Sequence, residues 1–158
     1  MLDIILIIVV AGLLGWAMRR AGVGSKGAEE NRSAGNLFLE QNKTEAGVEC
    51  SSSGLQWKVL QPGTGTRHPT AKSKVRVHYH GTLTNGKVFD SSVERNDPIS
   101  FRLNQVIPGW TEGVQLMVEG EKRRLFIAPD LGYGNHRAGD IPPGSVLIFD
   151  VELLAIED

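Results

Sequence analysis

The sequence has a single cysteine, Cys50, among its 158 residues, so no disulfide bond can form within the chain. It also lacks an excess of charge, because 17 lysines and arginines face 18 aspartates and glutamates and the formal net charge is −1. A surface without excess positive charge does not favour nucleic acid as a partner. A phosphate-binding loop is missing too, because Gly63, Gly65, Gly132 and Gly134 lack the strand, GxGxxG pattern and helix that surround such loops. These absences argue against nucleic acid binding and phosphate chemistry, and we expect no cofactor.

Long hydrophobic runs are absent except for one, residues 2–18, which ends at Arg19 and Arg20. A membrane-spanning helix needs about 20 apolar residues, with a lower limit of about 17, so this run is barely long enough. A cleaved secretory signal is one alternative, although Asp3 stands where such signals carry positive charge. A buried core helix is another. We expect residues 1–20 to form a hydrophobic membrane-anchor helix.

The composition changes after this run. Residues 21–50 are rich in glycine, serine, asparagine and charged side chains, which predicts a polar linker. Within it, residues 36–47 contain good helix formers and predict a short helix that carries no chemistry. Residues 51–158 contain short apolar runs separated by turn residues, a pattern typical of a mostly antiparallel β domain.

The apolar runs predict strands at residues 55–60, 75–83, 99–103, 121–128 and 145–154. Asn85 and Gly86 predict a tight hairpin turn, which places Tyr79 and Phe89 on the two strands of one hairpin.

One short helix is expected to begin at Pro108, since proline suits the first helical position, and to end near Met117. So short a helix cannot cover both faces of the sheet. We therefore predict an α+β fold in which the sheet curls around the helix and leaves an open end for a pocket.

Aromatic residues make up only 6% of the chain, yet most of those in the β domain fall beside turns or where strands would meet the helix. They are Tyr79, Phe89, Phe101, Trp110, Phe126, Tyr133 and Phe149. Each of them alone is compatible with core packing. Asp90 and the Tyr133 hydroxyl would add a few polar groups to an apolar site, which is typical of a ligand pocket. The glycines on either side of Trp110 are expected to leave space around its indole.

No constellation of a nucleophile and a base is present. Ser91 and Ser92 are better explained by turn chemistry than by catalysis. His78 and His80 share one face of a strand and could in principle bind a metal, but no third ligand follows at a recognisable spacing. Solvent-facing histidines are the preferred interpretation.

Four stretches occur in order and at related spacing: VHYHGTLTNGKVFDSS, FRLNQVIPGWTEGVQLMVEGEKRR, LGYGN and IPPGSVLIFDVELL. Together they resemble an FKBP-type peptidyl-prolyl cis-trans isomerase of the bacterial type with an N-terminal membrane anchor. The resemblance covers residues 53–156 and implies a half-open antiparallel β-barrel wrapped around one short helix.

The resemblance also implies the site residues. The catalytic residues would be Asp90, Tyr133 and Trp110, and the substrate-binding residues would be Tyr79, Phe89, Phe101, Val106, Ile107, Ile141 and Phe149. In the family, the tryptophan matching Trp110 forms the pocket floor and receives the proline ring, and the backbone N–H of Ile107 is a further donor. Asp90 and Tyr133 would be the polar contacts.

The implied activity is acceleration of X-Pro bond rotation in protein chains by noncovalent stabilisation of a twisted amide, which assists protein folding. A non-catalytic peptide-binding or chaperone module using the same pocket is the alternative. Two departures from the family pattern affect the expected ligands. Ile99 replaces an aromatic residue of many members, and the loop NHRAGD carries Arg137 and Asp140.

The expected partners are proline-containing polypeptides, macrolide inhibitors and the membrane. Arg19 and Arg20 favour a cytoplasmic domain behind a single-pass anchor. The junction FLEQNKTEAGV followed by SGLQWKVL instead resembles bacterial envelope members of the family, which favours the periplasmic face.

Overall fold

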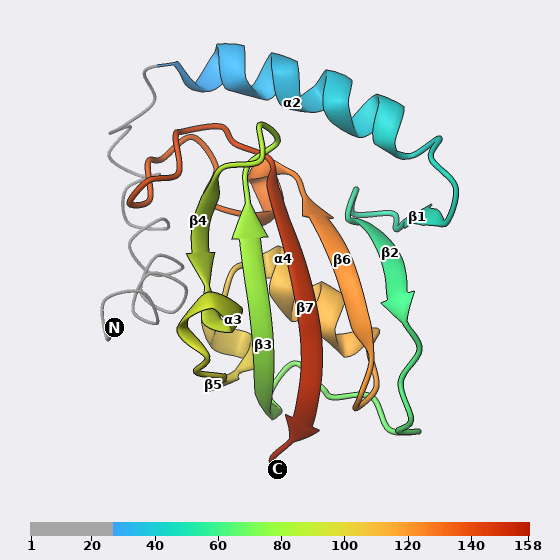
Figure 1. Ribbon diagram of the computed structural model, residues 1–158. Coiled ribbons are helices and arrows are strands. Elements are labelled where there is room, and N and C mark those ends of the chain that lie inside the picture. Colours follow the sequence, from blue (N-terminus) through green and yellow to red (C-terminus); the bar gives the residue numbers. More distant parts are fainter. Residues whose placement is uncertain (1–26) are drawn as a thin grey trace.

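The computed structural model of the chain describes residues 27–158. Its main feature is a seven-stranded sheet in which every neighbouring pair of strands is antiparallel (Figure 1). The strands are β1 (Val48–Cys50), β2 (Gln56–Gln61), β3 (Lys74–Thr82), β4 (Val88–Ser91), β5 (Ile99–Arg102), β6 (Lys122–Ile127) and β7 (Leu147–Ile156). The helices are α2 (Ala28–Asn42), α3 (Ser92–Arg95) and α4 (Pro108–Gln115), with 3-10 turns at Leu103–Gln105 and Pro129–Leu131.

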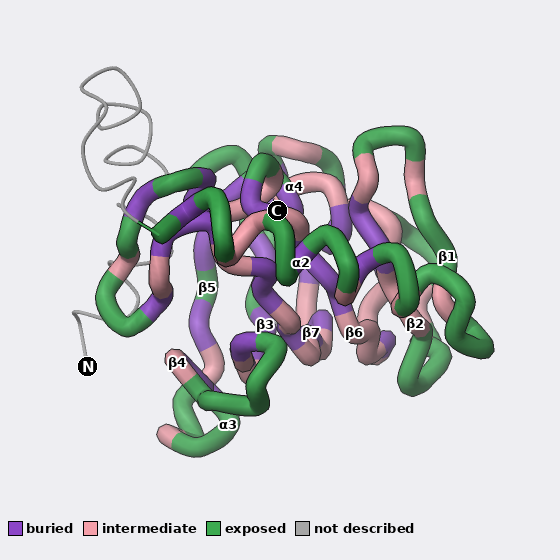
Figure 2. Tube along the Cα trace, turned by 90° about the horizontal axis from the view of Figure 1, so that it is seen from above, coloured by how far each residue is buried: buried purple, intermediate pink, exposed green. Residues whose placement is uncertain are grey.

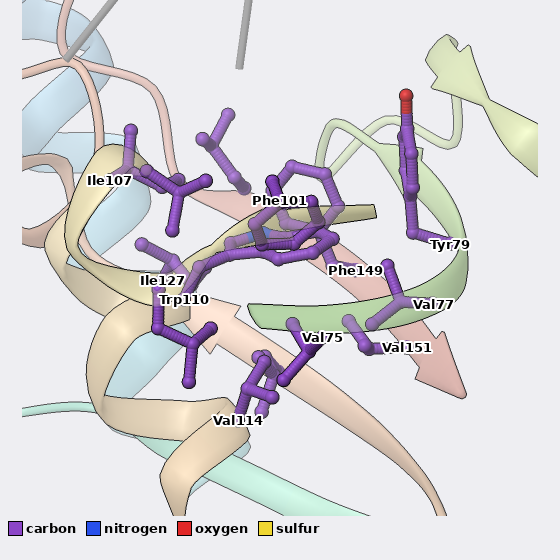
Figure 3. Packing of buried hydrophobic residues seen from close by; sticks show 14 of the residues in the cluster. Val75, Val77, Tyr79, Phe101, Ile107, Trp110, Val114, Ile127, Phe149 and Val151 are labelled. Carbon is purple, nitrogen blue, oxygen red and sulfur yellow. The ribbon is translucent and has the colours of Figure 1, made fainter. Parts of the chain in front are cut away.

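The strand order is β1-β2-β6-β7-β3-β4, and β5 pairs with β3 outside this path. β3 and β7 form the centre of the sheet, and both alternate between buried and more exposed residues. Val75, Val77 and Tyr79 of β3 are completely buried. Their side chains join the core between the sheet and α4 (Figure 3). The period of two seen in the sequence thus corresponds to one face on the core and one face outside.

α4 lies across the inner face of the sheet, and two glycines determine how closely it approaches. A Cβ atom on Gly109 would lie 2.7 Å from the Ile127 side chain, and one on Gly113 would lie 2.8 Å from Leu125. The expectation that glycines leave space around Trp110 was therefore wrong. These glycines bring the helix against β6, and Trp110 itself is fully buried.

α2 lies across one end of the sheet, over the ends of β6 and β7 (Figures 1 and 2). Its buried residues are Ala28, Gly35 and Leu39, which form one stripe along the helix. Leu39 belongs to a small cluster with Phe126 and Val146. The helix begins well before residue 36, where the sequence predicted a short helix, and β1 was not predicted at all.

The predicted half-open barrel holds in part, as an antiparallel sheet with helices, and the predicted membrane anchor needs correction. The sheet curves around α4 but is not closed into a barrel, because β1 and β4 end the strand path without pairing with each other.

The predicted membrane anchor, residues 1–20, lies outside the described residues. No helix within residues 27–158 has the length and apolar character needed to cross a membrane. We therefore do not retain the predicted single-pass localisation.

Candidate functional site

Aromatic rings from four elements meet around Trp110. The ring centroid of Trp110 lies 5.1 Å from that of Phe149 on β7, and 5.5 Å from those of Tyr79 on β3 and Phe101 on β5. Phe89 on β4 extends the cluster, at 5.3 Å from Phe149. The pairs with Tyr79 and Phe149 are edge-to-face, a favourable arrangement for aromatic rings. Figure 3 shows Trp110 between the helix and the strands.

The structure brings nearly all residues of the expected site into this one cluster. The buried core contains Tyr79, Phe101, Val106, Ile107, Trp110, Tyr133, Ile141 and Phe149, and Phe89 packs against it while partly buried. Ile107 directly precedes α4, so its side chain and Trp110 are positioned by the same helix start. Ile141 bridges to Ala138 within the loop that follows Tyr133. Asp90 joins the cluster through Tyr79.

The indole N–H of Trp110 is buried and donates to no hydrogen-bond acceptor. An unpaired buried donor costs free energy, and such groups are rare in folded proteins. The donor lies within the apolar cluster of buried side chains. The unpaired donor is unusual for ordinary core packing and makes this cluster the candidate site.

The polar edge of the cluster is a network of three side chains. The Tyr79 hydroxyl donates to Oδ2 of Asp90 at 2.5 Å, and Nη1 of Arg95 donates to Oδ1 at 2.5 Å. Nη2 of Arg95 also donates to the Tyr79 oxygen at 3.1 Å. Burial and the hydrogen bond to Asp90 raise the pKa of the Tyr79 hydroxyl well above its usual value, while the Arg95 charge opposes this rise.

Arg95 is a site residue that the sequence interpretation missed. Arg95 is the last residue of the short helix α3, which begins two residues after Asp90. Ser91 caps this helix, because its hydroxyl accepts from the backbone N–H of Glu94 at 3.1 Å. The helix ends at Asn96, which adopts a left-handed conformation with φ of 52°. A capping serine directly after Asp90, with a basic residue four positions later, was the available signal.

The Ser92 hydroxyl forms hydrogen bonds with β3 next to this network. Its hydroxyl accepts from the Tyr79 backbone N–H at 2.7 Å and lies 2.9 Å from Nδ1 of His78. His80 Nδ1 likewise lies 2.9 Å from the Ser91 hydroxyl. Both histidines are partly buried and hydrogen-bonded to serine, rather than simply facing solvent.

Tyr133 is held in the loop that follows β6 and is almost fully buried. Burial, and then the negative charge of Asp90, raise the pKa of its hydroxyl above the usual value. Tyr133 and Asp90 therefore act on each other electrostatically although they come from different elements. Both tyrosines remain neutral hydrogen-bonding groups at physiological pH.

Gly81 on β3 allows the Phe89 ring to lie over the sheet. A Cβ atom at this position would lie 2.6 Å from Phe89 and 2.8 Å from Phe149. Only glycine permits both rings to approach the backbone this closely. The sequence interpretation did not single out this glycine, because a lone glycine in a strand has several explanations.

Comparison with known proteins agrees with this geometry. Residues 65–154 match the family described as FKBP-type peptidyl-prolyl cis-trans isomerase. Residues 16–59 match the domain amino terminal to FKBP-type peptidyl-prolyl isomerase. This second match begins inside the predicted membrane anchor, so it assigns part of that segment to a recognised domain.

One similar protein is the FKBP-type peptidyl-prolyl cis-trans isomerase FkpA of Aeromonas hydrophila, which is 55% identical over 132 residues, or 84% of this chain and 49% of the relative. The crystal structure of FkpA from Escherichia coli superposes with a TM-score of 0.80 at 42% identity, covering 92% of this chain and 70% of that one. A peptidyl-prolyl cis-trans isomerase structure from Pseudomonas syringae gives a TM-score of 0.76 at 40% identity, covering 83% and 96%. The chain spans about half the length of the curated relatives it matches.

Proposed function

The chain belongs to the FKBP-type peptidyl-prolyl cis-trans isomerase family, and from this premise we propose that it accelerates rotation about X-Pro bonds in protein chains and so assists their folding. The observation that carries the proposal is the buried aromatic cluster around Trp110, with an unpaired indole N–H at its centre and the network of Tyr79, Asp90 and Arg95 at its edge.

The chemistry needs no nucleophile. Amide resonance imposes a barrier of about 18–20 kcal/mol on rotation, and uncatalysed exchange of an X-Pro bond takes tens to hundreds of seconds. Resonance places negative charge on the carbonyl oxygen, and water stabilises that charge. An apolar, aromatic environment removes the water and therefore favours the less polar, twisted amide.

We assign the proposed roles as follows. The Trp110 indole forms the floor on which the proline ring rests, and the surrounding apolar side chains exclude water. These substrate-binding side chains are Tyr79, Phe89, Phe101, Val106, Ile107, Ile141 and Phe149. Asp90, fixed by Tyr79 and Arg95, orients the peptide near its carbonyl group, and the Tyr133 hydroxyl contributes a second polar contact. Both would act more strongly on the twisted amide than on the planar one.

The same cluster is also proposed to take macrolide inhibitors. The two departures from the family pattern differ in their expected effect. Ile99 is buried in the core, whereas Arg137 and Asp140 are exposed on the loop after Tyr133. Exposed charges at the rim affect the residue before proline and large ligands more than they affect the proline ring.

The test is exchange spectroscopy on a peptide that contains one X-Pro bond, with the full chain added in catalytic amount. We expect faster cis-trans exchange, and we expect a macrolide inhibitor of this family to suppress it. Trp110→Leu should lose the acceleration, and the exposed substitution Leu37→Ala on α2 is the control. Peptide binding without any acceleration would show a binding module instead of an enzyme.

A further inference from the structure

The loop between β6 and β7, residues 129–145, is closed by its own backbone hydrogen bonds. The Gly144 N–H donates to the Gly134 carbonyl at 2.8 Å, and Ala138 and Ile141 exchange two hydrogen bonds at 3.0 and 2.9 Å. This loop carries Tyr133 and Ile141, which are both part of the proposed site. Because the loop is bonded to itself, these two residues move together with it.

Helix α2 contacts both limbs of this loop through side chains of its first turns. Arg32 donates from Nη2 to Oδ1 of Asp130 at 2.8 Å and from Nε to Oδ1 of Asn135. On the returning limb, Nδ2 of Asn31 donates to the Pro143 carbonyl at 2.8 Å. Two neighbouring residues of one helix thus hold two sides of the loop.

The backbone of α2 also approaches the loop as closely as glycine allows. A Cβ atom on Gly144 would lie 2.4 Å from the Ala28 carbonyl oxygen. Within the helix, a Cβ atom on Gly35 would lie 2.7 Å from Val146, just beyond the loop. A shift of the helix therefore cannot leave the loop unaffected.

The carboxy-terminal end of α2 is held by β6 and β2. Leu39 packs on Phe126, and the Leu39 carbonyl accepts from Nε2 of the buried Gln56 at 3.0 Å. A groove of about 140 Å³ separates the middle of the helix from the turn between β3 and β4. The helix is consequently anchored at one end, free along one side, and attached to the loop at the other end.

We propose that Arg32 is a positioning residue: through Asp130 and Asn135 it transmits the placement of α2 to the loop, and so to Tyr133 and Ile141. This inference rests on the proposed isomerase function, because its consequence is that the position of α2 changes the isomerase activity of the site. Exposed ion pairs contribute little to stability, so the expected role of Arg32 is geometric. Misplacing a group in a site costs rate even when the fold is intact.

The experiment compares full-length variants by exchange spectroscopy on an X-Pro peptide and by amide NMR of the loop. Arg32→Ala removes both side-chain contacts, and Gly35→Ala pushes the helix from Val146 while favouring helix formation. Lys43→Ala, which removes one positive charge just beyond the distant end of the same helix, is the matched control.

We expect Arg32→Ala and Gly35→Ala to lower kcat/KM by about threefold to tenfold. The thermal midpoint should be nearly unchanged in Arg32→Ala and lower in Gly35→Ala, where the added methyl group meets Val146. The Gly134 and Ile141 amide resonances should shift in both variants but not in Lys43→Ala. Arg32→Lys should recover part of the activity, because an ammonium group can reach one acceptor but does not form the fork of contacts that a guanidinium makes.

Two results would overturn the inference. One is an Arg32→Ala variant whose loop resonances match those of the control, and the other is a shifted loop with wild-type kcat/KM. If the wild-type chain accelerates no exchange, the proposed function fails instead, and the loop resonances still show whether Arg32 positions the loop.

Discussion

Replacing Asp90 by Asn removes one negative charge and keeps the shape of the side chain. Both carboxylate oxygens accept hydrogen bonds at 2.5 Å, one from the Tyr79 hydroxyl and one from Arg95. Hydrogen bonds to a charged group contribute about 1.5–3 kcal/mol and neutral ones about 0.5–1.5 kcal/mol, so about 1 kcal/mol is lost where the neutral amide oxygen still accepts. At least as much is lost at the other position, where the amide nitrogen cannot accept. The Asp90 side chain is 5% exposed and that of Arg95 15%, so water replaces little of the lost interaction.

The free energy of unfolding should therefore fall by about 2–3 kcal/mol in Asp90→Asn, measured by urea denaturation. The effect on turnover has a separate origin. If the carboxylate orients the twisted amide, one charge-assisted contact of about 1.5–3 kcal/mol is lost in the transition state. That corresponds to a decrease in kcat/KM of roughly tenfold to 150-fold, measured by exchange spectroscopy below the unfolding temperature.

Tyr79→Phe separates the two effects. It removes one partner of Asp90 but keeps the carboxylate charge and its contact with Arg95. We expect a stability loss of about 1–2 kcal/mol, with a smaller loss of turnover than in Asp90→Asn. The reasoning would be refuted if folded Asp90→Asn turned over the peptide as fast as the wild-type chain, since Asp90 would then serve only the ion pair.

Further predictions concern the two tyrosines and two backbone positions. Because the pKa values of Tyr79 and Tyr133 are both raised, the stability that comes from keeping them neutral is complete below about pH 10, the unfolded pKa, and is lost as pH rises further. Ultraviolet titration of the native chain should thus show no tyrosinate near pH 10. Formation of tyrosinate with a midpoint near pH 10 would contradict the raised pKa values. Gly81→Ala would place a methyl group 2.6 Å from Phe89 and should lower the free energy of unfolding by about 1–3 kcal/mol in urea denaturation; an unchanged value would refute the close approach. Asn96→Ala, at φ of 52°, should cost about 1 kcal/mol and lower the thermal midpoint, whereas Asn96→Gly should not.

The antiparallel strands and α4 could be predicted from the sequence because their signals are local. Alternation in β3, the Asn85-Gly86 turn and Pro108 at the start of α4 each act over a few residues. The resemblance supplied the members of the aromatic cluster, and the structure brings them together around Trp110.

The parts that escaped prediction depend on contacts between distant segments. The first half of α2 is held by the close approach of Ala28 to Gly144 and of Gly35 to Val146, and its own apolar pattern is too weak to reveal those partners. Arg95 was missed although the predicted hairpin already places β3 beside β4, because its contacts with Asp90 and Tyr79 also require the short helix α3 that carries it. The glycines of α4 were misinterpreted because their partners Leu125 and Ile127 are on β6.

Those two glycines also constrain the order in which the protein folds. α4 has only eight residues, two of them glycine, and a helix of this length and composition is not stable in isolation. It gains its stability by packing on the sheet, through its glycines on β6 and through Trp110 on Phe149 of β7, the strand that pairs with β6. Trp110 therefore reaches its place only when the carboxy-terminal strand has docked. Because β7 is synthesised after Trp110, we infer that the proposed site, and with it the proposed activity, depends on β7 having folded.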